Sequence, residues 1–388
     1  MLEKIAELLT ANLPNLIALE VEQSGRAIRE MNAQVPSLTK WFKYYAALIR
    51  TEERAVLPTS GKLHNWIDRK PLGVVAQITP FNHPLLIAVK KIAPALAAGN
   101  SIVLKPSELT PITSLLLGPI FQKAGLPDGV FNVLAGDGPT TGKALVSHPL
   151  IKKVDVTGGT PSGRAIGAIA GYNLASYTAE LGGKAPVIVT KNADLDLAVN
   201  GVCFGSFIAS GQTCIAATRI IVENSILPDF IAKLKSKAAS IERRMGAPTN
   251  PASMMGPLIS KKQLDNVMTL VDEAIERGVT VVTGGERMSG SSALDSYELS
   301  KGYFYPPTVL ADGKANIVNT RIWKEEAFAP VIVVVGFNGE EEALRLANDS
   351  EFGLGAAVWT NDLSQAYRLS DGIESGICWS KLLIQKCL

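Results

Sequence analysis

The sequence predicts an α/β protein made of two domains. Its 388 residues are enough for two to three domains of ordinary size. Short apolar runs alternate with helix-length segments, and this alternation begins again after Gly182 and Gly183. Strands that alternate with helices usually build parallel sheets covered on both faces. We therefore expect one domain over residues 1–181 and a second over residues 182–388.

The first domain is expected to open with helices. Apolar residues recur at helical spacing from Leu2 to about Arg50. Polar and helix-breaking residues then surround short extended pieces, which predicts a protruding hairpin over residues 53–72 that can serve subunit contacts. Beyond it we expect strands at Gly73–Ile78, Ile102–Leu104, Phe131–Leu134 and Lys153–Val156, and helices at Leu85–Ala98, Ile112–Ala124 and Ser162–Ala170.

The second domain repeats the alternation with longer helices. The segment Gly284–Lys301 is rich in Gly and Ser and is interpreted as a loop insertion. We expect strands at Val187–Val189, Ile220–Val222, Val279–Val282, Val331–Val335 and Ala356–Trp359, and helices at Pro228–Arg244, Lys261–Arg277, Gly339–Asn348 and Leu363–Asp371.

Composition excludes several classes of protein. The 38 basic and 36 acidic residues leave a charge of only +2, which does not favour nucleic acid or an anionic membrane as partner. Two stretches without charge, Pro71–Val89 and Leu197–Thr218, contain polar or helix-breaking residues unsuited to lipid. No CxxC pair and only three scattered histidines are present, so no metal site is expected. No address signal is recognised, which makes the cytoplasm the default expectation.

The turn after the first expected strand carries a candidate for oxyanion binding. Open α/β sheets bind ligands at the carboxyl ends of their strands. Asn82 follows Thr79, Pro80 and Phe81 at such an end. Its side-chain amide can donate to a developing oxyanion without adding charge. The alternative is that Asn82 is a turn residue bonded to its own backbone.

Two further strand ends are suited to a nucleotide. Lys105 and Glu108 can reach ribose hydroxyl or phosphate oxygens, although exposed Lys and Glu are more often simply solvated. Thr157, Gly158 and Gly159 form a glycine turn that opens a helix, whose N–H groups can face a pyrophosphate. A strict GxGxxG is absent, so this turn is not an ordinary dinucleotide fingerprint.

The second domain supplies a candidate nucleophile, and the domain boundary supplies a candidate base. Cys214 lies in a turn that contains Gly211, where the backbone can expose a thiol and lower its pKa. The alternative is a buried, inert cysteine. Glu180 precedes Leu181 and the two glycines, where its carboxylate can activate water or form a salt bridge between domains.

Taken together, these motifs strongly resemble the aldehyde dehydrogenase superfamily over nearly the whole chain. The order Glu180–Lys184 followed by Gly211–Cys214 is the main signature. Three other segments are similar to the family's Pro-aromatic-Asn turn, its ribose-binding stretch and its cofactor loop, and a fourth to its late Glu-aromatic-Pro motif. These are Pro80–Asn82, Lys105–Glu108, Thr157–Gly163 and Glu325–Pro330.

The resemblance implies a Rossmann-like cofactor domain, an α/β catalytic domain, and oxidation of a small or medium apolar aldehyde. It implies that Cys214 attacks the aldehyde carbon, that Asn82 helps to hold the oxyanion, and that Glu180 activates water to hydrolyse a thioester. Glu108 disfavours a ribose 2′-phosphate, so NAD is expected ahead of NADP. The implied cofactor contacts are Thr79, Pro80, Phe81, Lys105, Glu108, Thr157, Gly158, Gly159, Leu181, Glu326 and Phe328.

The sequence departs from the family pattern in several places. Gly159 stands where many relatives have Ser, Ala329 where a Gly is usual, and Ala209 where an Asn is common. The chain opens within the family's early helices and diverges after Ser375–Ile377, and we interpret its tail, 381–388, as a shifted frame, altered splice or gene-model error. Interface strands typical of the family are then missing, which weakens the expectation of a homo-oligomer.

Two alternatives to hydrolytic aldehyde oxidation follow from these observations. A shortened, non-catalytic homologue that binds nucleotide or a full-length partner fits the missing terminal elements. Acylation of coenzyme A by the thioester is a third hypothesis, but relatives that use coenzyme A commonly lack the carboxylate represented here by Glu180.

Overall fold

The computed structural model describes residues 1–314 and 316–381. The expectation of an aberrant tail falls on residues that, beyond Lys381, lie outside the described part of the chain. Tertiary contacts divide the chain into two compact units. Unit 1 comprises Met1–Ser24 and Met31–Leu181, and unit 2 comprises Gly25–Glu30 and the chain from Gly182 onward.

Unit 1 contains a five-stranded parallel sheet in the order β3-β2-β1-β4-β5. Because crossovers between parallel strands are right-handed, this order places α5 and α6 on one face of the sheet and α7 and α8 on the other. On the face covered by α7 and α8, Ala76 and Val154 pack against Leu145, Val146 and Ala170. The strands are β1 (Val74–Ile78), β2 (Ser101–Lys105), β3 (Phe131–Val133), β4 (Ile151–Thr157) and β5 (Ser176–Glu180).

Helices form most of the rest of unit 1. The predicted helical entry and the three predicted helices between strands are all present, with ends shifted by one or two residues. They are α1 (Leu2–Ala11), α2 (Leu13–Ser24), α3 (Ile28–Gln34), α4 (Thr39–Leu48), α5 (Pro84–Ala97), α6 (Ile112–Lys123), α7 (Lys143–Ser147) and α8 (Thr160–Tyr172). The first residues of α3, as far as Glu30, belong to unit 2.

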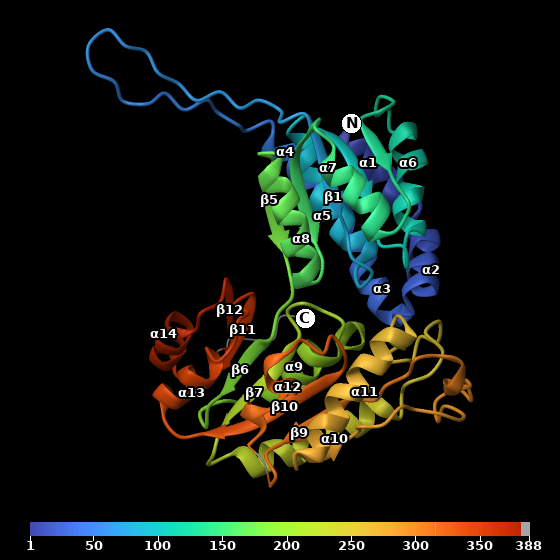
Figure 1. Ribbon diagram of the computed structural model, residues 1–388, viewed down its shortest axis with the longest axis vertical. Coiled ribbons are helices and arrows are strands. Elements are labelled where there is room, and N and C mark those ends of the chain that lie inside the picture. Colours follow the sequence, from blue (N-terminus) through green and yellow to red (C-terminus); the bar gives the residue numbers. More distant parts are fainter. Residues whose placement is uncertain (315, 382–388) are drawn as a thin grey trace. The chain divides into compact units, whose positions relative to one another are not determined.

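The segment between α4 and β1 is an exposed two-stranded arm. Val56 pairs with Trp66 in an antiparallel bridge. The Leu57 N–H donates to Asn65 O and the Ile67 N–H to Ala55 O, both at 2.9 Å. Every residue from Thr51 to Leu72 is exposed. Figure 1 draws this arm as a long loop that leaves the helices and strands of unit 1.

Unit 2 contains a seven-stranded sheet in the order β12-β11-β6-β7-β10-β9-β8. Its pairs are parallel except that β8 runs antiparallel to β9, which differs from the all-parallel expectation. The strands are β6 (Ala185–Val189), β7 (Ala217–Glu223), β8 (Thr280–Thr283), β9 (Thr308–Ala311), β10 (Val331–Phe337), β11 (Gly355–Trp359) and β12 (Ile377–Lys381). The helices are α9 (Leu195–Phe207), α10 (Leu227–Glu242), α11 (Lys261–Glu276), α12 (Arg321–Lys324), α13 (Glu340–Ala347) and α14 (Leu363–Gly372).

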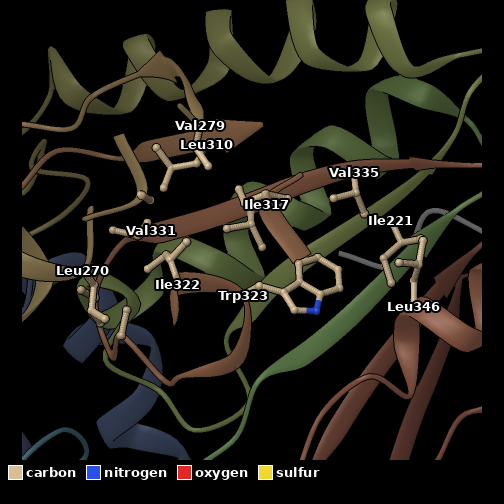
Figure 2. Packing of buried hydrophobic residues seen from close by; sticks show 14 of the residues in the cluster. Ile221, Leu270, Val279, Leu310, Ile317, Ile322, Trp323, Val331, Val335 and Leu346 are labelled. Carbon is tan, nitrogen blue, oxygen red and sulfur yellow. The ribbon is translucent and has the colours of Figure 1, made fainter. Parts of the chain in front are cut away.

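The core of unit 2 lies on both faces of its central strands. In β7, Ile221 joins one buried cluster while Ile220 and Val222 join the other, as the two-residue period of a strand requires. Figure 2 shows Trp323 of α12 within the first cluster, together with Val331 and Val335 of β10. Burial on both sides explains why these strands are continuous apolar runs in the sequence.

Candidate active site

The predicted cofactor residues of unit 1 lie at the carboxyl edge of its sheet. Thr79–Asn82 follow β1, Lys105 ends β2, Thr157 ends β4 and Glu180 ends β5. The strand order reverses between β1 and β4. Thr79–Asn82 and Thr157 therefore flank the switch point at which doubly wound sheets bind ligands.

The Asn82 side chain is buried, and its turn is tied to the neighbouring turn. Asn82 is only 7% exposed and Lys105 only 3%. The Thr79 N–H donates to Lys105 O at 3.1 Å, which joins the ends of β1 and β2. His83 precedes α5, and its Nδ1 lies 3.1 Å from Gln34 Nε2 of α3.

The Lys105 ammonium is directed along its own turn. Lys105 Nζ donates to Pro106 O at 3.0 Å and lies 3.4 Å from a carboxylate oxygen of Glu108. The Lys105 side chain is buried, whereas the Glu108 side chain is 56% exposed. A fixed cation beside an open carboxylate offers both a donor and an acceptor to a polar ligand.

The glycine turn after β4 leaves a helix N-terminus without a cap of its own. Gly159 is the N-cap of α8 and provides no side-chain hydrogen bond. The Gly158 N–H donates to Glu180 O at 3.1 Å, which ties this turn to the end of β5. A Cβ atom on Gly163 would lie 2.4 Å from a methyl carbon of Leu181, so α8 packs closely against the residue that follows Glu180.

A buried ion pair that sequence reasoning missed lies beneath this edge. Lys91 of α5 donates to Asp155 of β4, and both side chains are largely buried. Burial lowers the pKa of Lys91, while the charges of Asp155 and Glu180 act in the opposite direction. The signal was available in the sequence, because Lys90 and Lys91 interrupt an otherwise apolar helix.

In unit 2 the candidate residues lie at the opposite end of the strands, the amino edge. Cys214 precedes β7, Glu326 and Phe328 precede β10, and Gly182 and Gly183 precede β6. The rule that open α/β sheets bind ligands at the carboxyl ends of their strands does not predict a site at this amino edge.

Strained backbone leads into Cys214. Ala209, Ser210 and Gly211 have φ values of 52°, 55° and 70°, a left-handed run that only glycine adopts without strain. Buried contacts stabilise this conformation: Ser210 Oγ donates to Gly256 O at 2.7 Å, and the Ile259 N–H donates to Gln212 Oε1 at 3.0 Å. Strained segments of this kind cluster at functional sites.

Gly183 joins the Cys214 turn to Glu326. A Cβ atom at Gly183 would lie 2.0 Å from Cys214 O, so the two backbones are in contact. The Gly183 N–H also donates to Glu326 Oε1 at 3.0 Å. Burial raises the pKa of Glu326, opposed by this hydrogen bond and by the charge of Lys184.

Phe328 stands on a second strained position. Its φ is 49°, and its carbonyl accepts from Gln263 Nε2 at 3.0 Å. The same amide nitrogen donates to Ala327 O at 2.7 Å, which fixes the backbone between Glu326 and Phe328. Gln263 of α11 is a further contributor that the sequence did not single out.

Each unit therefore gathers its own set of predicted residues. In the part of the chain that the structure describes, no group of three or more His, Cys, Asp or Glu residues is arranged to hold a metal ion. In that part no helix is long and apolar enough to cross a membrane.

Comparison with known proteins identifies the family. The model of the aldehyde dehydrogenase family matches residues 1–382. The chain belongs to this family, as predicted, and the predicted α/β fold is confirmed by its solved relatives.

Curated relatives include two plant enzymes. Aminoaldehyde dehydrogenase 1, peroxisomal, from Pisum sativum is 38% identical over 382 residues, which are 97% of this chain and 73% of the relative. Betaine aldehyde dehydrogenase, chloroplastic, from Beta vulgaris is also 38% identical and covers 97% of this chain, which corresponds to 74% of the relative.

Solved structures agree with this assignment. A putative aldehyde dehydrogenase from Burkholderia cenocepacia has a TM-score of 0.93 and 38% identity, and the match covers 99% of this chain and 77% of that one. Betaine aldehyde dehydrogenase from Staphylococcus aureus in complex with NAD+ has a TM-score of 0.93 and 34% identity, with 99% of this chain and 74% of that one covered.

Proposed function

We propose that this aldehyde dehydrogenase oxidises an aldehyde to a carboxylic acid with NAD and with Cys214 as nucleophile. The support for the nucleophile is the strained turn before Cys214 and its backbone contact with Gly183, whose N–H binds Glu326. Family membership does not favour the alternative of a non-catalytic homologue.

The proposed chemistry begins at the Cys214 sulfur. Its thiolate adds to the aldehyde carbon and forms a tetrahedral thiohemiacetal. The Asn82 amide and the Cys214 N–H donate to the oxyanion. Loss of hydride from that carbon leaves a thioester on Cys214. Glu180 then removes a proton from water, which attacks the thioester carbonyl and releases the acid and the thiolate.

The residues of unit 1 fit a dinucleotide. Gly159 leaves the first N–H groups of α8 without a side-chain cap, which suits a pyrophosphate. Lys105 and Glu108 offer a donor and an acceptor to ribose hydroxyls, and the Glu108 charge opposes a 2′-phosphate. When bound, the nicotinamide accepts the hydride. Structural neighbours in complex with NAD+ support NAD ahead of NADP.

The first test is NADH formation by the wild type and by Cys214→Ser. The aldehyde panel includes aliphatic, aromatic and amino aldehydes, because two relatives are named for aminoaldehydes and for betaine aldehyde. We expect turnover in the wild type and its loss in Cys214→Ser, with NAD binding retained. Equal turnover in both proteins would exclude Cys214 as nucleophile.

A second test separates hydrolysis from transfer to coenzyme A. Under the proposal, Glu180→Gln forms one equivalent of NADH in a burst and then stalls as the acyl-enzyme. Mass spectrometry of the intact chain measures the added acyl mass. Steady turnover of the wild type only when coenzyme A is added would instead support the acyl-transfer hypothesis.

We infer that the arm contacts a second copy of this chain. Val56, Leu63 and Trp66 are 64%, 72% and 52% exposed, which is unusual for apolar residues on so narrow a segment.

The cytoplasm remains a prediction for the location of this protein, since the two named relatives are peroxisomal and chloroplastic.

A further inference from the structure

Helix α2 carries two polar side chains that reach the starts of two other helices of unit 1. These helices are α5, which begins directly after the Asn82 turn, and α6, which begins shortly after Lys105 and Glu108. Neither helix has a side-chain cap from its own N-cap residue, which is His83 for α5 and Pro111 for α6. Their first N–H groups therefore need acceptors from elsewhere.

Glu20 provides the acceptor at α5. Its side chain is fully buried, at 0% exposure. The first residue of α5 is Pro84, which has no N–H, and the next N–H, that of Leu85, lies 3.5 Å from Glu20 Oε2. This distance is long for a hydrogen bond, but a buried carboxylate at a helix N-terminus also interacts favourably with the helix dipole.

Gln23 provides the acceptor at α6. The Ile112 N–H, the first of that helix, donates to Gln23 Oε1 at 3.0 Å. Glu20 and Gln23 are also joined to each other and to Thr113. Gln23 Nε2 donates to Glu20 Oε1 and to Thr113 Oγ1, both at 2.7 Å, and the Thr113 hydroxyl donates to Glu20 Oε1 at 2.5 Å.

We propose that Glu20 and Gln23 are positioning residues: Glu20 holds the turn that presents the Asn82 amide, and Gln23 holds the segment that presents Lys105 and Glu108. This inference rests on the proposed function of those three residues. An oxyanion donor is effective only when it is already placed where charge develops. Because Glu20 binds the start of the helix that follows the Asn82 turn, we expect it to affect the rate of the chemical step.

The two residues predict different kinetic effects, which a merely structural role would not separate. In Glu20→Gln one carboxylate oxygen becomes an NH2 group, which then faces a donor, either the Leu85 N–H or the pair Thr113 and Gln23. The Asn82 turn loses one of the contacts that hold it, and we expect kcat to fall by about tenfold or more while KM for NAD stays nearly constant. Gln23→Ala is expected to raise KM for NAD with a smaller change in kcat.

The decisive experiment is a double-mutant cycle with Glu20→Gln, Asn82→Ala and the double variant. If Glu20 acts through Asn82, Glu20→Gln slows the wild type but has little further effect in the Asn82→Ala background. Additive losses would overturn the proposal. A normal kcat in Glu20→Gln together with a low kcat in Asn82→Ala would also overturn the proposal, but would leave the proposed role of Asn82 intact. A normal kcat in Asn82→Ala would overturn the role of Glu20 and the role of Asn82 together.

Thr113→Val provides a second route should Glu20→Gln fail to fold. It removes one donor to Glu20 and leaves the carboxylate in place. Circular dichroism and NAD affinity show whether each variant retains the fold. A lower kcat in folded Thr113→Val that disappears in the Asn82→Ala background supports the proposal, and a kcat equal to wild type contradicts it.

Discussion

At the scale of single residues, Gly183 has no room for a side chain. Its N–H binds Glu326 and its α-carbon faces the Cys214 carbonyl. The Glu326 side chain and the Cys214 backbone thus both contact one residue that has no room for a methyl group. The family signature that contains this glycine therefore has a steric reason as well as a chemical one.

Gly183→Ala is expected to lower kcat by more than about tenfold, because the new methyl must displace the backbone of Cys214. Steady-state kinetics measures the effect. Gly171→Ala is the matched control, since a Cβ there meets nothing within 4 Å and the residue lies in α8. Equal kinetics in the two variants would show that the Cys214 turn tolerates the displacement.

Lys184 makes stability depend on pH. Burial, with the nearby Arg219 charge, lowers its pKa from 10.5 to about 7, against the opposing charges of Glu326 and Glu325. Between about pH 7 and 10.5 the unfolded chain therefore binds more protons at this lysine than the folded chain. Its contribution makes the free energy of unfolding rise with pH across that window.

Lys184→Met is expected to remove this rise. The difference in urea midpoint, variant minus wild type, is expected to be larger at about pH 6.5 than at about pH 10. The reason is that the wild type carries the cost of a buried charge only at the lower pH. Unfolding is followed by tryptophan fluorescence at both pH values. A midpoint difference that does not change with pH would show that Lys184 keeps its ordinary pKa.

At the scale of elements, Arg219 of β7 holds the end of α13. Its guanidinium donates to the carbonyls of Leu346, Ala347 and Asp349 at 2.9, 2.7 and 3.2 Å, and to Lys184 O at 2.9 Å. The Trp323 ring lies 5.2 Å from the same group. A cation at the carboxyl end of a helix is favourable, and here it also satisfies buried carbonyls.

Arg219→Met is expected to lower the free energy of unfolding by about 3 kcal/mol, because several buried carbonyls lose their donor. Chemical unfolding measures the change. Arg287→Met serves as the control: Arg287 also donates to two carbonyls, those of Ser300 and Gly302, but at the exposed surface. A loss no larger than that of the control would contradict a capping role for Arg219.

Three elements that the sequence did not predict lack the patterns that mark the predicted ones, each for its own reason. The strand β5 is polar and mostly exposed, as an edge strand can be, so it lacks the apolar run that marks the others. The helix α9 buries one face, but its exposed face carries Leu197 and Phe204 beside Asp196 and Asn200, so no clear polar stripe marks it. The helix α12 has four residues, too few for a period to appear.

At the scale of the whole molecule, the chain is two units with separate sheets and one exposed arm. Each unit buries its own apolar residues. The arm contributes to neither core, since its residues from Thr51 to Leu72 are all exposed. Removing it should therefore leave both units folded, and any effect on mass would report contacts between copies of the chain.

Replacing Ala55–Ile67 by a Gly-Ser linker is expected to reduce the molar mass in light scattering, while circular dichroism stays unchanged. Loss of Val56 and Trp66 removes the apolar surface proposed to contact a second copy. Leu174→Ser is the control, because Leu174 is 94% exposed but lies outside the arm. A mass unaffected by removal of the arm would contradict the proposal.

The sequence by itself determined the α/β class, the alternation of elements and the family, because strand and helix periods and the order of the motifs are local properties. It also singled out Cys214, Glu180 and Asn82 as candidates. Only the tertiary structure decided which neighbours hold these residues: Gly183 against the Cys214 carbonyl, and Glu20 at the start of α5. Glu20 and Leu85 are 65 positions apart, and no local pattern connects residues that only packing brings together.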